Sequence, residues 1–244
     1  MKSMAYALEV KELAKIINER ILVDRISFNV EEGEIFGLLG SSGSGKTTTF
    51  RMLTGLMAPS SGSIKYFGKK FEKQNTLKDI GFVTQDDSIY PGLTIAQNIE
   101  YFGAIYKVKK DEIKTRMEKI LEKMELLERK DSLASELSGG MRKRLNIAVS
   151  IIHNPKIIFF DEPTVGLDPS IRKGVWSAIE NLNKEGKTII LTSHYMDEVE
   201  RLCKRVGIMH RGKMVARGSV DEIKKKYGIK QMEDVFSEII KMEI

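Results

Sequence analysis

A short glycine-rich segment between an apolar run and a helix-like stretch restricts the fold of this chain more than any other feature. Its pattern G-x-x-x-x-G-K-[ST] is formed by Gly40, Ser41, Ser42, Gly43, Ser44, Gly45, Lys46 and Thr47. Residues 35–39 before it are typical of a strand buried on both faces of a parallel sheet, and residues 46–57 after it are predicted to form a helix. The sequence therefore predicts a strand–loop–helix unit whose loop is built from small residues.

This unit has the chemistry of a phosphate cradle. Small residues allow consecutive backbone N–H groups to converge on phosphate oxygens, and the following helix presents its positive end to the same anion. Lys46 can reach the β- and γ-phosphates, and the Thr47 hydroxyl can coordinate Mg²⁺. The alternative is a flexible glycine–serine loop, but the flanking strand and helix argue against it. We therefore expect a nucleotide site.

The rest of the chain alternates strand-like and helix-like segments. Strands are predicted at residues 7–13, 26–30, 64–67, 79–84, 157–160 and 188–192. A helix with apolar residues along one side, from Ile171 to Leu182, is expected to end at Gly186, a residue suited to the C′ position. This alternation predicts an α/β core. From about residue 94 to 150, Lys and Glu dominate and apolar residues recur at helical spacing, which predicts a helical insertion.

Composition limits the class of protein. At 244 residues the chain can form one large domain or a core with one sizeable insertion. No run approaches the ~18–20 apolar residues that a membrane span needs, and residues 1–10 do not resemble a secretory signal, so we expect a cytoplasmic protein. Cys203 is the only cysteine, which excludes an intramolecular disulfide. The net charge is +6, and the basic residues at 201–226 are more typical of a solvated face, so no nucleic acid is expected as a partner.

Two adjacent acids end the apolar run at residues 157–160. Asp161 could hold Mg²⁺, directly or through water, and Glu162 could orient and deprotonate an attacking water. Taken alone, the pair is equally compatible with an Asp-Glu turn at the surface. Its position at the end of a buried strand, in a chain that carries a phosphate cradle, favours the catalytic interpretation.

One further segment and two single residues are candidates for the site because of where they lie in the chain. Ser138, Gly139 and Gly140 lie between the helical insertion and a predicted helix at residues 142–152, where Ser138 could also serve as an ordinary helix cap. His194 follows the predicted strand at residues 188–192. Because that strand is expected to run parallel to the others, His194 could reach the γ-phosphate. Gln85 stands where a core strand passes into the insertion.

With these motifs in this order, the chain resembles the nucleotide-binding subunit of an ABC transporter over essentially its whole length. The resemblance implies that residues 40–47, together with Thr48 and Ile17, bind ATP, and that Thr47, Gln85 and Asp161 bind Mg²⁺. It implies that Glu162 is the catalytic base, with Lys46 and His194 as further catalytic residues. It also implies that Leu137 to Met141 form the signature motif, of which Ser138, Gly139 and Gly140 cover the ATP held by a second cassette.

The resemblance also implies a fold and a division of the chain. The fold is a RecA-like P-loop NTPase core with an antiparallel β subdomain and an inserted α-helical subdomain. In a single domain spanning residues 1–244, the core is expected at 1–86 and 153–220, the helical subdomain at about 87–152, and a helical tail at about 221–244.

Departures from the family pattern narrow the function. The family stacks adenine on an aromatic residue at the position of Ile17, so apolar contact is expected here instead. Met141, where the signature normally ends in Gln, and the tail at residues 232–236 resemble the drug, ion and polysaccharide exporter branch. Export would require a second cassette and a separate transmembrane permease, which would dock near residues 85–94 and hold the chain on the inner face of the cell membrane. A cassette ATPase in iron–sulfur cluster assembly remains the alternative.

Overall fold

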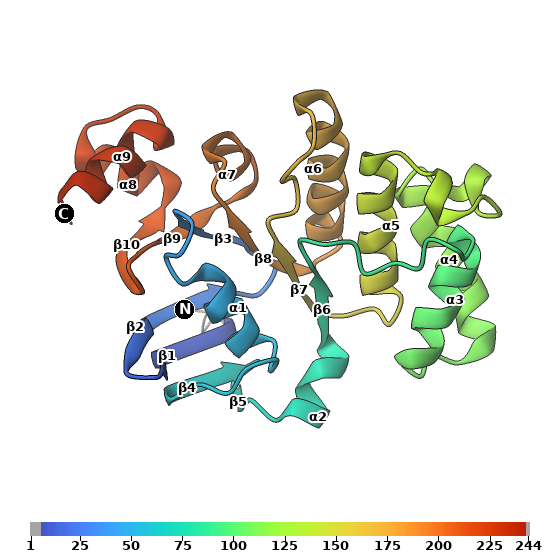
Figure 1. Cartoon of the computed structure of the whole chain (residues 1–244), viewed down its shortest axis with the longest axis horizontal. Helices are drawn as coiled ribbons and strands as arrows, with labels where there is room; N and C mark the ends of the chain where they lie inside the picture. Colours follow the sequence, from blue (N-terminus) through green and yellow to red (C-terminus); the bar gives the residue numbers. More distant parts are fainter. Residues whose placement is uncertain (1–5, 243–244) are drawn as a thin grey trace, which may run out of the picture.

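The computed structural model describes residues 6–242, in which a four-stranded sheet and a six-stranded sheet enclose the helix that follows the glycine-rich segment (Figure 1). This helix, α1 (Lys46–Leu53), contributes Phe50, Met52 and Leu53 to the core between the sheets. It ends earlier than the predicted residue 57, because Gly55 takes a φ of 72°, which leaves the helical region. The remaining helices lie on the opposite face of the larger sheet and beyond its edges (Figure 1).

The smaller sheet is antiparallel and has the order β2-β1-β4-β5. Its strands are β1 (Tyr6–Ile17), β2 (Arg20–Glu31), β4 (Ser61–Tyr66) and β5 (Lys69–Lys70). The long β1–β2 hairpin closes through Asn18 and Glu19, whose φ values of 47° and 63° are those of a type I′ turn. Both strands extend well beyond the predicted ranges. Many residues in the added parts are exposed to solvent, so the sequence there lacks the apolar pattern by which a strand is predicted.

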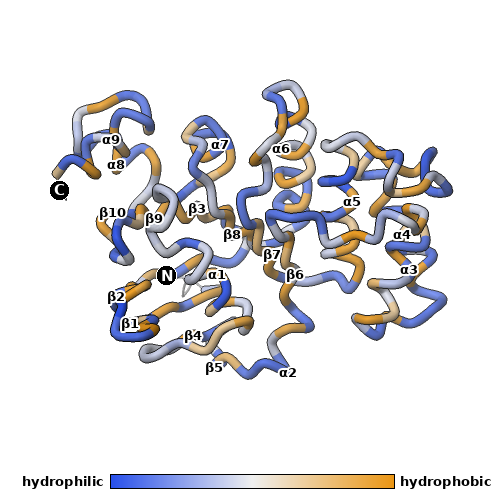
Figure 2. Tube along the Cα trace, viewed as in Figure 1, coloured by the Kyte–Doolittle hydropathy of each residue, from blue (hydrophilic) through white to orange (hydrophobic). Residues whose placement is uncertain are grey.

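The larger sheet has the order β10-β9-β3-β8-β7-β6. The five strands β9, β3, β8, β7 and β6 are parallel to one another. Its strands are β3 (Ile35–Gly40), β6 (Ile80–Val83), β7 (Ile157–Asp161), β8 (Thr188–Ser193), β9 (Arg205–His210) and β10 (Lys213–Ser219). Every residue of β3, β7 and β8 is buried, as expected for strands covered on both faces. Figure 2 shows these central strands as largely hydrophobic. The predicted α/β architecture is confirmed.

Two cores result from this arrangement. On one face, Phe159 of β7 packs edge-on against Phe50 of α1, with ring centroids 5.3 Å apart. On the other face, Phe160 packs with Val175 and Ile179 of α6 (Pro169–Lys184) in the larger core. The C-cap of α6 is Glu185, so Gly186, with a φ of 85°, occupies the predicted C′ position. Successive side chains of β7 thus pack against α1 on one face of the sheet and against α6 on the other.

The predicted helical insertion is a group of three helices beyond β6 and β7. These are α3 (Ile95–Ile105), α4 (Lys110–Lys123) and α5 (Gly139–Ile151). Thr94 and Gln97 form a reciprocal capping box that starts α3. The short helices α2 (Lys73–Thr76), η1 (Leu77–Asp79), η2 (Leu127–Arg129) and η3 (Ala134–Glu136) complete this half of the chain. The helices share one hydrophobic core with the larger sheet, so no separate core lies between residues 87 and 152.

After β8 the structure contains elements that the sequence analysis did not identify. These are α7 (Met196–Leu202) and the strands β9 and β10. The helices α8 (Val220–Tyr227) and α9 (Met232–Met242) follow, where a helical tail was expected. Several late basic residues contact carboxylates: Arg205 lies 3.1 Å from Glu34, and Lys224 lies 2.7 Å from Glu200. Part of the basic segment at residues 201–226 is therefore paired with acids in other parts of the fold. Within residues 6–242, no helix combines the length and apolar character required to cross a membrane.

Candidate active site

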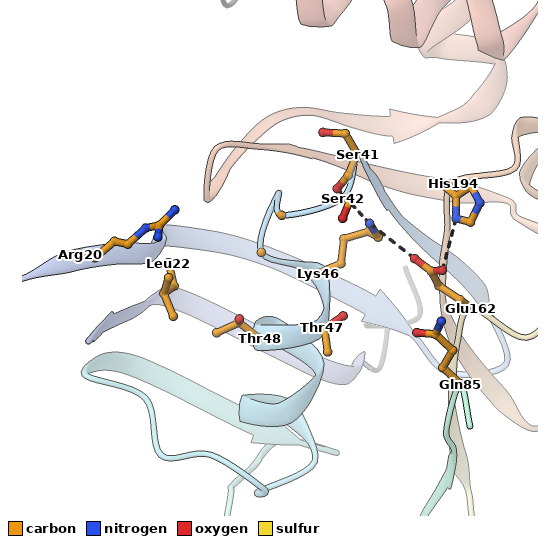
Figure 3. A pocket seen from close by; sticks show the side chains of 12 residues that line it. Arg20, Leu22, Ser41, Ser42, Lys46, Thr47, Thr48, Gln85, Glu162 and His194 are labelled. Carbon is orange, nitrogen blue, oxygen red and sulfur yellow. Dashed lines mark hydrogen bonds and ion pairs between the residues drawn. The ribbon is translucent and has the colours of Figure 1, made fainter. Parts of the chain in front are cut away.

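A pocket of about 820 Å³ opens at the carboxyl ends of the parallel strands β3, β7 and β8 (Figure 3). Such ends are where α/β sheets bind their ligands, because loops diverge there and leave a crevice. The pocket is lined by Arg20, Leu22, Ser41, Ser42, Gly43, Gly45, Lys46, Thr47, Thr48, Gln85, Glu162 and His194. Most of the residues predicted for nucleotide binding and catalysis therefore lie around one cavity.

The glycine-rich loop leads into the N-terminus of α1. Gly45 precedes the helix with a φ of 104°, and a Cβ there would lie 2.8 Å from the Leu22 carbonyl oxygen, so a larger residue would be strained and crowded. Lys46 is only 5% exposed, and its Nζ donates to the carbonyl oxygens of Gly40 (2.7 Å) and Ser41 (3.2 Å). Burial lowers the pKa of Lys46, while the nearby Glu162 and Asp161 oppose that change. The loop thus holds a cation at the base of the pocket.

A threonine on the neighbouring strand fixes both acids at the end of β7. Thr192 of β8 is opposite Asp161 in the parallel register; its Oγ1 donates to Asp161 Oδ1 (2.7 Å) and accepts from the N–H of Glu162 (2.9 Å). Burial raises the pKa of Asp161, and the Thr192 hydrogen bond opposes that rise. Sequence reasoning missed Thr192, because its role depends on the register between two strands that are distant in sequence. A threonine at the end of an otherwise apolar strand was the available signal.

Glu162 connects the phosphate loop to the histidine. Its Oε1 lies 3.8 Å from Lys46 Nζ and its Oε2 lies 3.3 Å from His194 Nδ1 (Figure 3). The glutamate adopts a φ of 47°, a left-handed conformation that is uncommon for a residue with a side chain. The three residues follow β3, β7 and β8, so the parallel arrangement of these strands brings them together, as the sequence predicted.

Gln85 reaches the same pocket from the end of β6 (Figure 3). Its side chain is exposed to the cavity, while its backbone carbonyl accepts a hydrogen bond from Lys143 of α5 at 2.8 Å. Lys143 played no part in the sequence prediction, because nothing local marks it. The contact connects the pocket to the helix that begins at the Ser-Gly-Gly segment.

That segment does not reach the pocket of its own chain. Ser138, Gly139 and Gly140 are absent from the pocket lining, and α5 lies on the far side of β7 from α1 (Figure 1). The Ser138 hydroxyl caps α5 by accepting from the N–H of Met141 at 3.4 Å. A Cβ on Gly140 would lie 2.3 Å from Ile171 Cγ2 of α6, so close packing requires glycine there. The segment presents an exposed helix N-terminus away from Lys46.

Ile17 also lies outside the pocket lining. It ends β1 with a side chain that is 41% exposed, and its partner across the hairpin is Arg20. Arg20 and Leu22 of β2 line the pocket in its place (Figure 3). The sequence could not reveal that Arg20 and Leu22 take the place of Ile17, because the length of the hairpin decides which strand faces the cavity.

We predict that Ile17→Tyr tightens ATP binding roughly two- to tenfold, because an aromatic side chain beside Arg20 would add stacking worth about 0.5–1.5 kcal/mol. Titration with a fluorescent ATP analogue measures the change. Ile16→Tyr is the matched control, because adjacent strand residues point to opposite faces. Equal effects of the two variants would contradict an adenine-binding site at the end of this hairpin.

Comparisons with known proteins agree with this geometry. The family profile described as "ABC transporter" matches residues 23–165. The chain is similar to the linearmycin resistance ATP-binding protein LnrL of Bacillus subtilis, at 39% identity over 91% of this chain and 72% of that protein. It is similar to the Nod factor export ATP-binding protein I of Cupriavidus metallidurans, at 37% identity over 90% of this chain and 73% of that protein. Its fold matches that of CbiO1 from Clostridium perfringens, described as part of the ABC transporter complex cbiONQ, with a TM-score of 0.83 and 29% identity over 98% and 100% of the two chains.

Proposed function

This chain belongs to the ABC transporter family, as an ATP-binding subunit with ATPase activity, and from that premise we propose that it powers export through a separate membrane subunit. The convergence of Lys46, Glu162 and His194 on one pocket carries the proposal, because it supplies the groups that ATP hydrolysis requires. The direction of transport is supported by relatives named for Nod factor export and linearmycin resistance. Met141 and the C-terminal tail support the same direction.

In the proposed reaction, the loop N–H groups and Lys46 hold the phosphates of ATP. Glu162 orients a water molecule for in-line attack on the γ-phosphate and accepts its proton. His194, within reach of the same carboxylate, contacts the γ-phosphate and keeps Glu162 directed into the pocket. Thr48 and the residues at the end of the β1–β2 hairpin lie further along the cavity, toward the nucleoside.

The donor set fits Mg²⁺ that is shared with the nucleotide. Thr47 and Gln85 line the pocket, and Asp161 places a buried carboxylate beneath it. No cluster of three or more His, Cys, Asp or Glu suited to a metal occurs within residues 6–242. One carboxylate, a hydroxyl and an amide match the preference of Mg²⁺ for few protein ligands together with phosphate oxygens and water. When bound, the ion would offset the negative charge of the phosphates.

A second cassette would complete the site. Ser138 is exposed at the start of α5, remote from its own pocket, so two chains arranged head to tail could each place this segment over the ATP of the other. The serine hydroxyl and the N–H groups at the helix N-terminus would then stabilise charge on the γ-phosphate. Hydrolysis would remove the phosphate that joins the halves and let them separate.

A membrane subunit is the second proposed partner. Beyond Gln85, the exposed rings of Tyr90 (46%) and Tyr101 (42%) contact each other with centroids 4.8 Å apart. Leu133, 39% exposed, is close by, because a β-bridge joins it to Thr94. Apolar rings gathered at the surface mark interaction sites, and this patch follows the segment that carries Gln85. Binding there would hold the chain on the inner face of the cell membrane.

Co-expression with a multi-span membrane subunit, sought among the products of the neighbouring genes, tests the proposal. We expect the chain to sediment with membranes only when that protein is present. The double variant Tyr90→Ser and Tyr101→Ser should reduce the bound fraction at least fivefold and keep ATP hydrolysis by the isolated chain. Leu56→Ser is the matched control, because Leu56 is 65% exposed but lies after α1, away from the patch. Recruitment that ignores the double variant would contradict this docking site, and recruitment without the membrane protein would contradict the proposed partner.

A further inference from the structure

Glu198 of α7 carries a fully buried carboxyl group that does not line the pocket. Its Oε1 accepts hydrogen bonds from Thr164 Oγ1 at 2.8 Å and from Trp176 Nε1 at 2.9 Å. Burial raises the pKa of Glu198, while hydrogen bonding by the side chains of Ser193, Thr164 and Trp176 opposes that rise. A buried carboxyl group costs free energy that an apolar side chain of similar size would avoid. The role of Glu198 therefore lies in the groups that it holds.

Thr164 is the first of these groups, and it lies two residues after Glu162. It is fully buried, in a turn closed by a hydrogen bond from the Val165 N–H to the Glu162 carbonyl at 3.3 Å. Glu162 adopts a φ of 47°, and such a conformation persists only where the surrounding structure holds it. The hydrogen bond from Thr164 to Glu198 anchors this turn to α7, so it restricts the direction of the Glu162 side chain.

Ser193 is the second group, and it lies directly before His194. Its hydroxyl accepts from the N–H of Tyr195 at 3.0 Å, which bends the chain around His194 where β8 ends. Glu198 follows His194 by four residues, so α7 returns its carboxyl group to the start of that bend. One carboxyl group therefore meets the segments of both Glu162 and His194, whose side chains approach to 3.3 Å in the pocket.

Trp176 is the third group, and it belongs to a helix that contributes no residue to the pocket lining. This helix, α6, packs against α7 (Figure 1). Trp176 is 7% exposed and donates to the same carboxylate oxygen as Thr164. Its hydrogen bond fixes the carboxyl group from the side of the core, whereas Thr164 and Ser193 connect that group to the site.

We propose that Glu198 is a positioning residue for hydrolysis, which holds the turn after Glu162 and the bend at His194 in the arrangement that brings the two side chains together. The inference rests on the proposed roles of Glu162 and His194. Because Glu198 does not line the pocket, its loss should leave nucleotide binding nearly unchanged. The loss should therefore appear in kcat and spare KM, as for an interaction that acts only in the transition state.

The test compares Glu198→Leu, Glu198→Gln, Thr164→Val and Trp176→Phe by steady-state phosphate release. Leucine removes the acceptor oxygens, whereas glutamine keeps an oxygen that can accept from Thr164 and Trp176. Thr164→Val and Trp176→Phe each remove one donor to the same carboxylate oxygen. Trp176→Phe is the matched control, because its donor comes from the helix without pocket residues.

We expect Glu198→Leu to lower kcat by about tenfold or more, because small displacements of reacting groups are costly, and to change KM for ATP by less than about twofold. Glu198→Gln should restore kcat to within about threefold of the parent. Thr164→Val should lower kcat by about fivefold or more, and Trp176→Phe should keep it within about twofold, although both lower the melting temperature. Equal losses of kcat in Thr164→Val and Trp176→Phe would show a general effect of stability and overturn the inference.

A double-mutant cycle shows whether Thr164 acts through Glu162. In a Glu162→Gln background, Thr164→Val should change the residual rate by less than about twofold, because the base that Thr164 positions is already absent. An undiminished loss in that background would overturn the inference. If Glu198→Leu does not fold, Thr164→Val and Trp176→Phe decide, since both retain the buried carboxyl group.

The outcomes separate this inference from the proposed mechanism. Parent kcat in Glu198→Leu and Thr164→Val, together with an inactive Glu162→Gln, would overturn the inference alone. Hydrolysis by Glu162→Gln at the parent rate would overturn the role of Glu162, and the inference with it.

Discussion

Replacing Glu162 with Gln should lower ATP hydrolysis at saturating Mg·ATP by about 10²–10⁴-fold, the range that a positioned general base contributes. The amide has nearly the size and shape of the carboxylate, but it cannot take a proton from the attacking water. The negative charge that faces Lys46 and His194 is lost, while the N–H of residue 162 can still donate to Thr192. Nucleotide binding should therefore survive, and an ATP-bound dimer should accumulate.

Phosphate release measures the rate, and size-exclusion chromatography with ATP measures the dimer. Glu128→Gln is the matched control: Glu128 is an exposed glutamate in η2, outside the pocket, and its variant should hydrolyse ATP at the parent rate. Hydrolysis by Glu162→Gln at the parent rate would remove Glu162 from the role of base, even if the variant still bound ATP.

Replacing Lys46 with Met should weaken ATP binding by at least tenfold and reduce hydrolysis by at least 10²-fold. A hydrogen bond to a charged group contributes about 1.5–3 kcal/mol, and the phosphates would lose the buried cation at the base of the pocket. Loss of a group that stabilises developing charge usually costs a further 10²–10³-fold in rate. Lys46 should therefore affect both binding and turnover, unlike Glu162.

Isothermal titration with ATP separates the loss of affinity from the loss of rate. Lys156→Met is the matched control: Lys156 pairs with Asp79 at 3.5 Å, outside the pocket, and its variant should retain both properties. Because burial disfavours the ammonium of Lys46, Lys46→Met should keep the melting temperature within a few degrees of the parent. Unchanged ATP affinity in Lys46→Met would show that the phosphates bind elsewhere.

Local patterns in the sequence were sufficient to predict the strand–loop–helix unit and the acids at the end of β7. These features are contiguous in the chain, and their physics needs no distant partner. The meeting of Glu162 and His194 was also predictable, because the ends of parallel strands share one edge of a sheet. The roles of individual site residues in ATP hydrolysis remain predictions.

What the sequence could not supply depends on register and distance. Thr192, Arg20 and Lys143 act through partners on other elements, and no local pattern identifies them. The strands β9 and β10 were missed, because basic residues interrupt their apolar positions. Arg205 at the start of β9 pairs with Glu34, more than a hundred residues earlier in the chain, so its charge is matched only after folding.

The left-handed backbone at Glu162 has a consequence for how two neighbouring acids can serve one substrate. In a continuous strand, consecutive side chains point to opposite faces, so Asp161 and Glu162 would be separated by the sheet itself. A φ of 47° at Glu162 interrupts that alternation where β7 ends, and the field of both acids reaches Lys46. One uncommon dihedral angle, which costs about 1–3 kcal/mol, would thereby let one residue of a dipeptide bind the proposed cation while the next accepts a proton.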